Sequence, residues 1–361
     1  MGEPLSRREF LKFSTLALGG LGSLGGLGLS NLAARTLPRP WPPAENPPPQ
    51  RMVGRVTTGW INAYTAPHFR SPKLESILRD KLVGIDEEFI SPYGPAHNPR
   101  WYHLRRGGFI HSAYIQRVED QHFNQPLSQI PEGGQLGEIT MAYSDSYRKL
   151  RRSWERLYRL YYGSVHWITH LLEGPDGKPW YGLTDELLHV QYCVPASHVR
   201  PILAEELAPI SPEVGFEKKR IVVSIAEQKL TAYEGEQAVF ETLVSTGIPS
   251  EGPLLNGIPT HTPDGQFRIS VKVPAKHMGD GNLTGDPEAY ELLGVPWVSF
   301  FHVTGVAFHG TYWHDNFGRK MSHGCVNMRN ADALWIYRWS EPLAGAGDWN
   351  IKGAGTVVVV E

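Results

Sequence analysis

The sequence predicts a mainly β protein built from several small domains. A chain of 361 residues exceeds the usual length of one domain. Short runs rich in β-branched and aromatic residues recur along it, separated by turns that contain Gly, Pro or Asp. One clear amphipathic helix is predicted, at residues 330–342 ("NADALWIYRWSEP"). We therefore expect successive β domains with one or few helices.

The N-terminal residues predict export rather than a folded domain. Arg7 and Arg8 precede "STLALGGLGSLGGLGL", which is typical of a twin-arginine signal over residues 1–35. The six glycines of that run argue against a transmembrane helix, since each costs about 1 kcal/mol relative to Ala. Residues 36–50 hold seven prolines and predict an extended linker. We expect an extracytoplasmic protein, in the periplasm or cell wall, that is tethered to the membrane only if the segment stays uncleaved.

Residues 51–120 and 133–205 contain two related sets of predicted strands. "RWYHLRRGGFIHSAYIQRV" reads as two strands separated by Gly107-Gly108, and "PWYGL" with "YCVPASHVRP" repeats this ending later. Between them, "SYRKLRRSWERLYRLYYG" is either a helix or an insertion. The first set resembles a bacterial SH3-like domain, a small β-barrel, and the second resembles a divergent copy. The resemblance implies contact with wall glycan or stem peptides.

Charge and cysteine content exclude other classes. The net charge is only −2, and no basic patch points to nucleic acid. The chain has two cysteines, so it is not a disulfide-stapled scaffold. Cys193 lies in a predicted strand and is expected to be a buried, unreactive thiol. A Cys193–Cys325 disulfide bond is chemically possible, but the two residues fall in different predicted domains.

The third region, residues 217–361, carries three histidines near the second cysteine in "HGTYWHDNFGRKMSHGCVN". A zinc site is disfavoured, because His309 and His314 are five residues apart and one residue separates His323 from Cys325. No pair of acidic residues stands nearby to support metal ligands. We expect no metal and no cofactor.

Nucleophilic catalysis fits the same residues better. A free thiol has a pKa of about 8.5 and needs a neighbouring base to react at neutral pH. His309 ends a predicted strand, and the loop that follows is long enough to return Cys325 beside it. Gly324 permits a tight turn whose N–H groups could bind an oxyanion. A buried structural cysteine is the alternative, but the polar loop residues around Cys325 disfavour it.

The residues around His309 and Cys325 resemble those of a known family. "HGT" followed by "MSHGCVNMRNADA" is similar to the active-site signature of the L,D-transpeptidase (YkuD-type) catalytic domain, and "TPDGQFRI" resembles an earlier strand of that family. The resemblance covers residues 217–361. It implies a β-sandwich-like catalytic domain behind the SH3-like modules.

The resemblance also assigns roles to residues. It implies Cys325 as the nucleophile and His309 as its base, with the backbone carbonyl of Gly310 orienting the imidazole. His323 and Gly324 would frame the oxyanion pocket together with Cys325. His314, in the intervening loop, is expected to wall the cleft rather than to catalyse. The remaining substrate-binding candidates are Ser322, Asn327, Arg329, Tyr312 and Trp313.

The implied activity is that of an exported peptidoglycan L,D-transpeptidase. A cysteine acyl-enzyme would form on a donor tetrapeptide stem, and an acceptor amine would resolve it into a 3→3 cross-link. The family also implies acylation by carbapenems. Two alternatives stay open from the sequence. Water as acceptor would make the enzyme an L,D-carboxypeptidase, and an inert third domain would leave a wall-binding protein.

Overall fold

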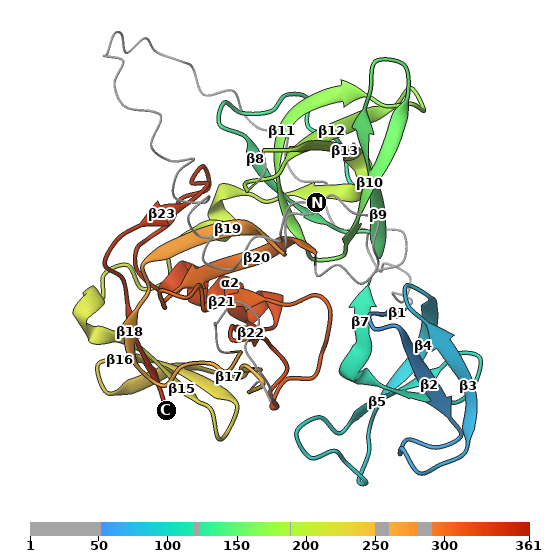
Figure 1. The fold of residues 1–361 in the computed structure, drawn as a ribbon, viewed down its shortest axis with the longest axis vertical. Coiled ribbons are helices and arrows are strands. Elements are labelled where there is room, and N and C mark those ends of the chain that lie inside the picture. Colours follow the sequence, from blue (N-terminus) through green and yellow to red (C-terminus); the bar gives the residue numbers. More distant parts are fainter. Residues whose placement is uncertain (1–51, 119–122, 188, 250–259, 280–290) are drawn as a thin grey trace, which may run out of the picture.

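The structure is a computed structural model that describes residues 52–118, 123–187, 189–249, 260–279 and 291–361. The export segment and the proline-rich linker predicted at its N-terminus lie outside these residues. Figure 1 shows three lobes in chain order, coloured blue to cyan, green, and yellow to red. In the described part of the chain, no helix has both the length and the apolar character needed to cross a membrane.

The first lobe is a seven-stranded antiparallel sheet with the order β3-β2-β6-β5-β4-β1-β7. The hairpin predicted at Gly107-Gly108 is formed, and it pairs Trp101 with His111. Both glycines have positive φ, of 93° and 87°, which a glycine adopts without strain. The strands are β1 (Val53–Val56), β2 (Trp60–Tyr64), β3 (Lys73–Leu78), β4 (Leu82–Ile90), β5 (Arg100–Leu104), β6 (Phe109–His111) and β7 (Ile115–Val118).

The second lobe repeats this topology. Its order, β10-β9-β13-β12-β11-β8-β14, becomes that of the first lobe when seven is subtracted from each strand number. A short 3-10 helix precedes the last strand in both lobes, η1 (Ser112–Tyr114) and η2 (Ala196–His198). The same strand order in both lobes is expected if the two lobes are an internal repeat. Their assignment as SH3-like domains stays a prediction. The strands are β8 (Gln135–Ile139), β9 (Tyr143–Lys149), β10 (Trp154–Tyr161), β11 (Val165–Glu173), β12 (Pro179–Thr184), β13 (Gln191–Pro195) and β14 (Val199–Pro201).

The helix considered for "SYRKLRRSWERLYRLYYG" is wrong. This stretch forms most of β9 and all of β10, which pair as an antiparallel hairpin. The stretch has a period of two, as a strand does. Tyr158 and Leu160 are buried, while Arg159 between them points to the other face and forms an ion pair with Asp145 at 2.8 Å. Aromatic residues at alternate positions favour a strand over a helix.

The third lobe contains two five-stranded sheets, ordered β17-β16-β15-β24-β18 and β22-β21-β20-β19-β23. Ile221 of one sheet and Phe308 of the other belong to one buried cluster, as expected for sheets packed around a common core. The prediction of a mainly β fold is confirmed. The strands are β15 (Lys219–Ser224), β16 (Lys229–Glu234), β17 (Gln237–Leu243), β18 (Gly265–Arg268), β19 (Val271–Met278), β20 (Leu292–Phe300), β21 (Ala307–Gly310), β22 (Val326–Met328), β23 (Ile351–Lys352) and β24 (Val357–Val360).

Helix α2 (Asn330–Trp339) follows β22 directly and packs against β20 and β21. It ends three residues before the end of the predicted 330–342 segment. Two buried lysines donate to carbonyls at its C-terminal end: Lys219 to Trp339 O at 2.9 Å, and Lys272 to Ser340 O at 2.9 Å. These amino groups satisfy carbonyl groups that a helix end leaves without partners. Two further 3-10 helices, η3 (Ala204–Leu207) and η4 (Phe216–Lys218), connect the second and third lobes.

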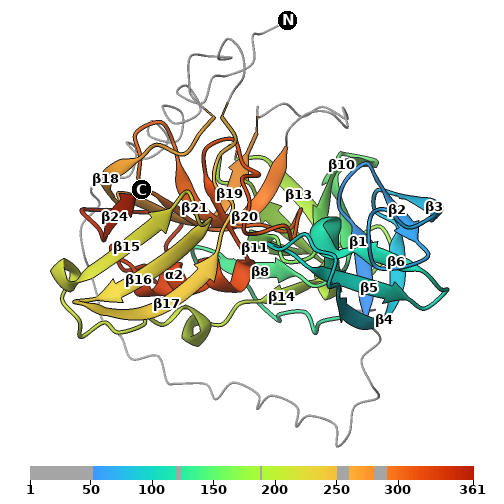
Figure 2. The ribbon, with the colours of Figure 1, turned by 90° about the horizontal axis from the view of Figure 1, so that it is seen from below.

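The second and third lobes share one hydrophobic core. Leu136, Val165 and Trp167 of the second lobe belong to the buried cluster that fills the third. Trp167 stacks on Trp349 with ring centroids 4.6 Å apart. A Cβ at Gly294 would lie 2.5 Å from Val165 O, so only glycine allows β20 to approach β11 this closely. Figure 2 shows β11 beside β19 and β20.

Arg55 of the first lobe lies where all three lobes meet. It is 2% exposed, and its guanidinium pairs with Asp80 at 3.1 Å within its own lobe. The same group lies 4.0 Å over the Tyr161 ring of the second lobe. It also donates to Tyr312 O of the third lobe at 3.3 Å. One buried side chain thus contacts all three lobes, and the third contact falls two residues beyond Gly310.

Candidate active site

The imidazole singled out in the sequence lies on β21, and the thiol lies one residue before β22, the parallel neighbour of β21. Strand β21 pairs with β22, with Phe308 opposite Val326 and His309 opposite Asn327. Phe308 and Val326 belong to the main core, whereas Ala307 and Cys325 belong to a separate apolar cluster. His309 and Cys325 are therefore on the same side of the strand pair, one diagonal step apart, which is about 8 Å between Cα atoms in a regular sheet.

The imidazole of His309 is buried and held in one orientation. Its Nδ1 lies 2.9 Å from the backbone oxygen of Gly310. A carbonyl oxygen can only accept, so Nδ1 carries the hydrogen and Nε2 of the neutral ring is left with its lone pair. A Cβ at Gly310 would lie 2.7 Å from Pro296 Cγ, so the residue that supplies the carbonyl has to be small. This arrangement leaves Nε2 as the basic atom.

Ser322 closes the turn that presents the thiol. Its hydroxyl donates to the backbone oxygen of Cys325 and accepts from Gly324 N at 3.1 Å. Gly324 has φ +122°, a backbone region that favours glycine. The Ser322 side chain is thus engaged within the turn, and its contact with a substrate stays a prediction. It also means that the Gly324 N–H, expected at the oxyanion pocket, is already donated.

Thr262 supports the same turn from outside and was missed by the sequence reasoning. Its buried hydroxyl accepts from Gly247 N and donates to Gly324 O, both at 2.8 Å. Gly247 forms an isolated bridge with Ser322, so this segment follows the turn closely. A Cβ at Gly247 would lie 2.9 Å from Gly324 Cα. The position of Thr262 beside the predicted turn "TPDG" gave no signal for this role.

His314 is part of the loop framework. Its Nε2 lies 3.0 Å from the side-chain amide of Asn327, and its Nδ1 accepts from Asn316 N at 3.2 Å. Burial and, secondarily, the nearby His309 lower the pKa of His314 to about 3, so it is neutral at physiological pH. Asn327 therefore fixes the loop. Trp313 is partly buried in the apolar cluster of Cys325, with its ring 5.7 Å from that of His309, and it walls the site.

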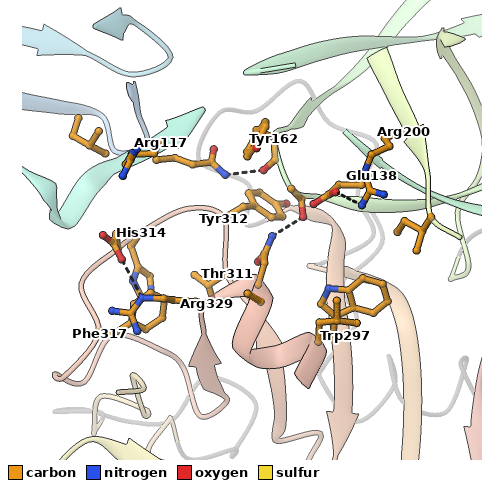
Figure 3. A pocket seen from close by; sticks show the side chains of 18 of the residues that line it. Arg117, Glu138, Tyr162, Arg200, Trp297, Thr311, Tyr312, His314, Phe317 and Arg329 are labelled. Atoms are coloured by element: carbon orange, nitrogen blue, oxygen red, sulfur yellow. Dashed lines mark hydrogen bonds and ion pairs between the residues drawn. The ribbon is translucent and has the colours of Figure 1, made fainter. Parts of the chain in front are cut away.

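Tyr312 and Arg329 do not line the site as expected. The Tyr312 hydroxyl donates to Leu293 O at 2.9 Å, and the side chain is buried. Arg329 lies 3.8 Å from Asp315 and over the Phe317 ring. Both residues face a cavity between the lobes, shown in Figure 3, and Cys325 and His309 are not among the residues that line it.

Cys193 plays no part in the site. Neither cysteine forms a disulfide bond, so the Cys193–Cys325 bridge is not formed. Cys193 is buried in β13, and burial raises the pKa of its thiol despite the opposing charge of Lys149. His323 is exposed, unlike the buried His309 and His314. Among the described residues, no three His, Cys, Asp or Glu side chains converge as metal ligands.

The Cys325 thiol is buried and donates to Gly305 O at 3.7 Å. A thiol one diagonal step from an oriented imidazole is compatible with a cysteine nucleophile. Residues 218–360 match the family model described as the L,D-transpeptidase catalytic domain (YkuD). Residues 218–360 of the third lobe therefore match a domain of the L,D-transpeptidase catalytic type, and the resemblance seen in the sequence is confirmed for this range. The match does not extend to the first two lobes.

The chain is similar to "Putative L,D-transpeptidase YqjB" of Bacillus subtilis (strain 168), with 27% identity over 84 residues. That match covers 21% of this chain and 46% of the relative, so the chain spans about half the length of the curated relative.

Three solved structures are similar as well, each with a TM-score below 0.5. The L,D-transpeptidase of Xylanimonas cellulosilytica DSM 15894 (residues 123–326) has 23% identity and a TM-score of 0.29, covering 40% of this chain and 60% of that one. The L,D-transpeptidase of Mycobacterium smegmatis has 16% identity and a TM-score of 0.31, covering 69% and 92%. The catalytic domain of the E. faecium L,D-transpeptidase has 24% identity and a TM-score of 0.29, covering 40% and 98%.

Proposed function

We propose that the protein is an exported peptidoglycan L,D-transpeptidase that forms 3→3 cross-links through a thioester on Cys325. The observation that carries the proposal is the hydrogen bond from His309 Nδ1 to Gly310 O at 2.9 Å, on the strand next to Cys325. This bond leaves Nε2 able to accept the thiol proton. The family match of residues 218–360 supports the choice of reaction.

The reaction would proceed in two halves. His309 Nε2 accepts the thiol proton of Cys325, and the thiolate attacks the carbonyl carbon of the third residue in a tetrapeptide stem. The tetrahedral intermediate collapses when His309 returns the proton to the amine of the terminal D-alanine, which leaves. The side-chain amine of a second stem then attacks the thioester, passes its proton to His309 and displaces the thiolate, which regains that proton.

The oxyanion of the tetrahedral intermediate needs backbone donors near Cys325. Because the Gly324 N–H is donated to the Ser322 hydroxyl at 3.1 Å, we assign the oxyanion contact to the N–H of Cys325 itself. The role of Ser322 is then to hold the turn in the shape that presents this donor. Trp313 and the apolar residues around Cys325 would limit the access of water to the thioester.

The other lobes and the N-terminal segment fit the same proposal. The twin-arginine pattern at Arg7 and Arg8 would deliver the folded protein across the cytoplasmic membrane. The two lobes of shared topology would act as SH3-like modules that contact wall glycan or stem peptides. The cell wall or periplasm is then the site of action.

The test is a pair of cysteine variants supplied with disaccharide-tetrapeptide. Cys325→Ala should lose both D-alanine release and dimer formation, whereas Cys193→Ala, the control thiol in β13, should keep both. D-alanine release without dimers in the parent protein would assign the L,D-carboxypeptidase reaction. Release that persists in Cys325→Ala would refute the cysteine mechanism altogether.

A further inference from the structure

The hairpin of β9 and β10 ends in a turn whose charges are all positive. Residues 149–154, "KLRRSW", hold three cations and no acid, in a chain whose net charge is −2. Lys149, Arg151 and Arg152 are all exposed. Within the part of the chain that the structure describes, none of the three forms an ion pair, whereas Arg159 farther along β10 pairs with Asp145 at 2.8 Å. We call residues 149–154 the basic tip.

Neighbouring segments do not neutralise the basic tip. Glu155 lies opposite Arg148 in the register of the hairpin, so these two charges offset each other. The β11–β12 turn beside the tip carries Glu173, Asp176 and Lys178. The tip and this turn together hold four cations against two acids, which leaves this end of the lobe positive.

Two apolar side chains accompany the cations of the basic tip. Leu150 is 43% exposed, between Lys149 and Arg151. Trp154 is partly exposed, and its ring centre lies 5.6 Å from Lys149 Nζ and 5.4 Å from that of Trp180. Cations around an exposed Leu and Trp are typical of segments that lie among the headgroups of a bilayer. A soluble phosphate polymer would be attracted by the same cations but would make no use of Leu150.

The basic tip lies at the end of the hairpin that points away from the first lobe (Figure 1). At the other end, Arg159 pairs with Asp80 of the first lobe at 3.0 Å, and the Tyr161 ring lies under Arg55. Trp154 begins β10 seven residues before Tyr161, which corresponds to about 23 Å of extended strand. A flat surface can therefore meet the tip without displacing the first lobe.

We propose that the basic tip binds the surface of an anionic phospholipid bilayer. Lys149, Arg151 and Arg152 would contact lipid phosphates, and Leu150 would enter the boundary between headgroups and acyl chains. The proposal depends neither on the reaction at Cys325 nor on cleavage of residues 1–35. Its consequence is that the second lobe faces the membrane.

A fluorophore on the basic tip tests the proposal. The full chain carries Cys193→Ala, Cys325→Ala and Ser153→Cys, and an environment-sensitive dye is attached at position 153, which is exposed. The apolar N-terminal run is expected to adsorb to vesicles of any charge, so the readout has to report on the hairpin itself. Vesicles are made of phosphatidylcholine alone or of an equal mixture with phosphatidylglycerol. The control chain carries the dye through Glu236→Cys, in the exposed turn between β16 and β17.

The dye on the tip should shift its emission to shorter wavelength on the anionic vesicles only, and the control dye should not shift on either. Arg151→Gln combined with Arg152→Gln should lower the ratio of bound to unbound tip about thirtyfold, since each cation near an anionic bilayer strengthens binding roughly fivefold. Leu150→Ser should lower it roughly fivefold. Arg156→Gln is the matched control: this exposed arginine of the same hairpin already pairs with Asp145 at 3.0 Å, so its loss should change the ratio by less than about twofold.

Three outcomes would overturn the proposal. The first is no shift of the tip dye on anionic vesicles, and the second is a shift that is equal on neutral vesicles or unchanged in the double arginine variant. The third uses inorganic polyphosphate as a soluble competitor. If polyphosphate displaces the tip from the vesicles and Leu150→Ser binds them as the parent does, the partner is a soluble phosphate polymer and not a membrane. The substituted tip residues are exposed, so these variants are expected to fold.

Discussion

Replacement of Thr262 by valine should loosen the turn that carries Cys325. Valine has the shape of threonine but lacks the hydroxyl, so it leaves two buried backbone groups, Gly247 N–H and Gly324 C=O, without partners. Each group costs about 1 to 3 kcal/mol when it loses its hydrogen bond in a buried site. The free energy of unfolding should therefore fall by about 2 to 6 kcal/mol. Urea titration followed by tryptophan fluorescence would measure this loss.

The same variant should lose activity by more than its folded fraction explains. A displacement of the turn by about 1 Å can reduce a rate by roughly a hundredfold. Thr262→Ser keeps the hydroxyl and should stay within about 1 kcal/mol of the parent, with D-alanine release largely preserved. The reasoning would be refuted if Thr262→Val and Thr262→Ser had equal stability and equal rates of D-alanine release and Cys325 alkylation.

Three other residues give separate predictions. Arg55→Met removes a buried cation from Asp80 and from Tyr312 O, while Asp80 keeps its ion pair with Arg159 at 3.0 Å. Urea titration should therefore show a loss of about 1 to 3 kcal/mol, and an unchanged free energy of unfolding would contradict the role of this junction. Burial lowers the pKa of His277, but hydrogen bonds to Asp185 and Glu291 outweigh burial and raise this pKa to about 9. The contribution of protonated His277 to the free energy of unfolding is therefore complete below about pH 6.5 and is lost as the pH rises through 9. Stability measured from pH 6.5 to 10 should therefore fall by up to about 3 kcal/mol more in the parent than in His277→Gln, and equal slopes would exclude this assignment. Because the pKa of His314 is lowered to about 3, His314→Gln should leave the pH dependence of Cys325 alkylation between pH 5 and 8 unchanged, whereas a shifted midpoint would mean that His314 titrates there.

Much of the fold could be predicted because its signals are local. Alternating residues and turn glycines such as Gly107, Gly108 and Gly235 mark the hairpins directly in the sequence. The hairpin of β9 and β10 is ambiguous in the sequence, because its many Arg and Tyr residues obscure the period of two. Burial of Tyr158 and Leu160 resolves it in the structure.

The site was less accessible to sequence reasoning, because its supports come from distant parts of the chain. The sequence predicts that His309 and Cys325 are close together, because a single loop joins them. Thr262 lies more than sixty residues before Gly324, and no local pattern connects the two. Likewise, the side of the loop on which Tyr312 lies depends on Tyr161 in another lobe.

The stack of Trp167 on Trp349 has a practical consequence for the design of fragments of this protein. A fragment that begins near residue 217 would retain every residue of the thiol site but would expose the surface now covered by Leu136, Val165 and Trp167. Such a truncated protein should aggregate or recover its solubility only when the middle lobe is supplied. The boundary at which sequence similarity begins is therefore not a boundary at which this polypeptide can be cut.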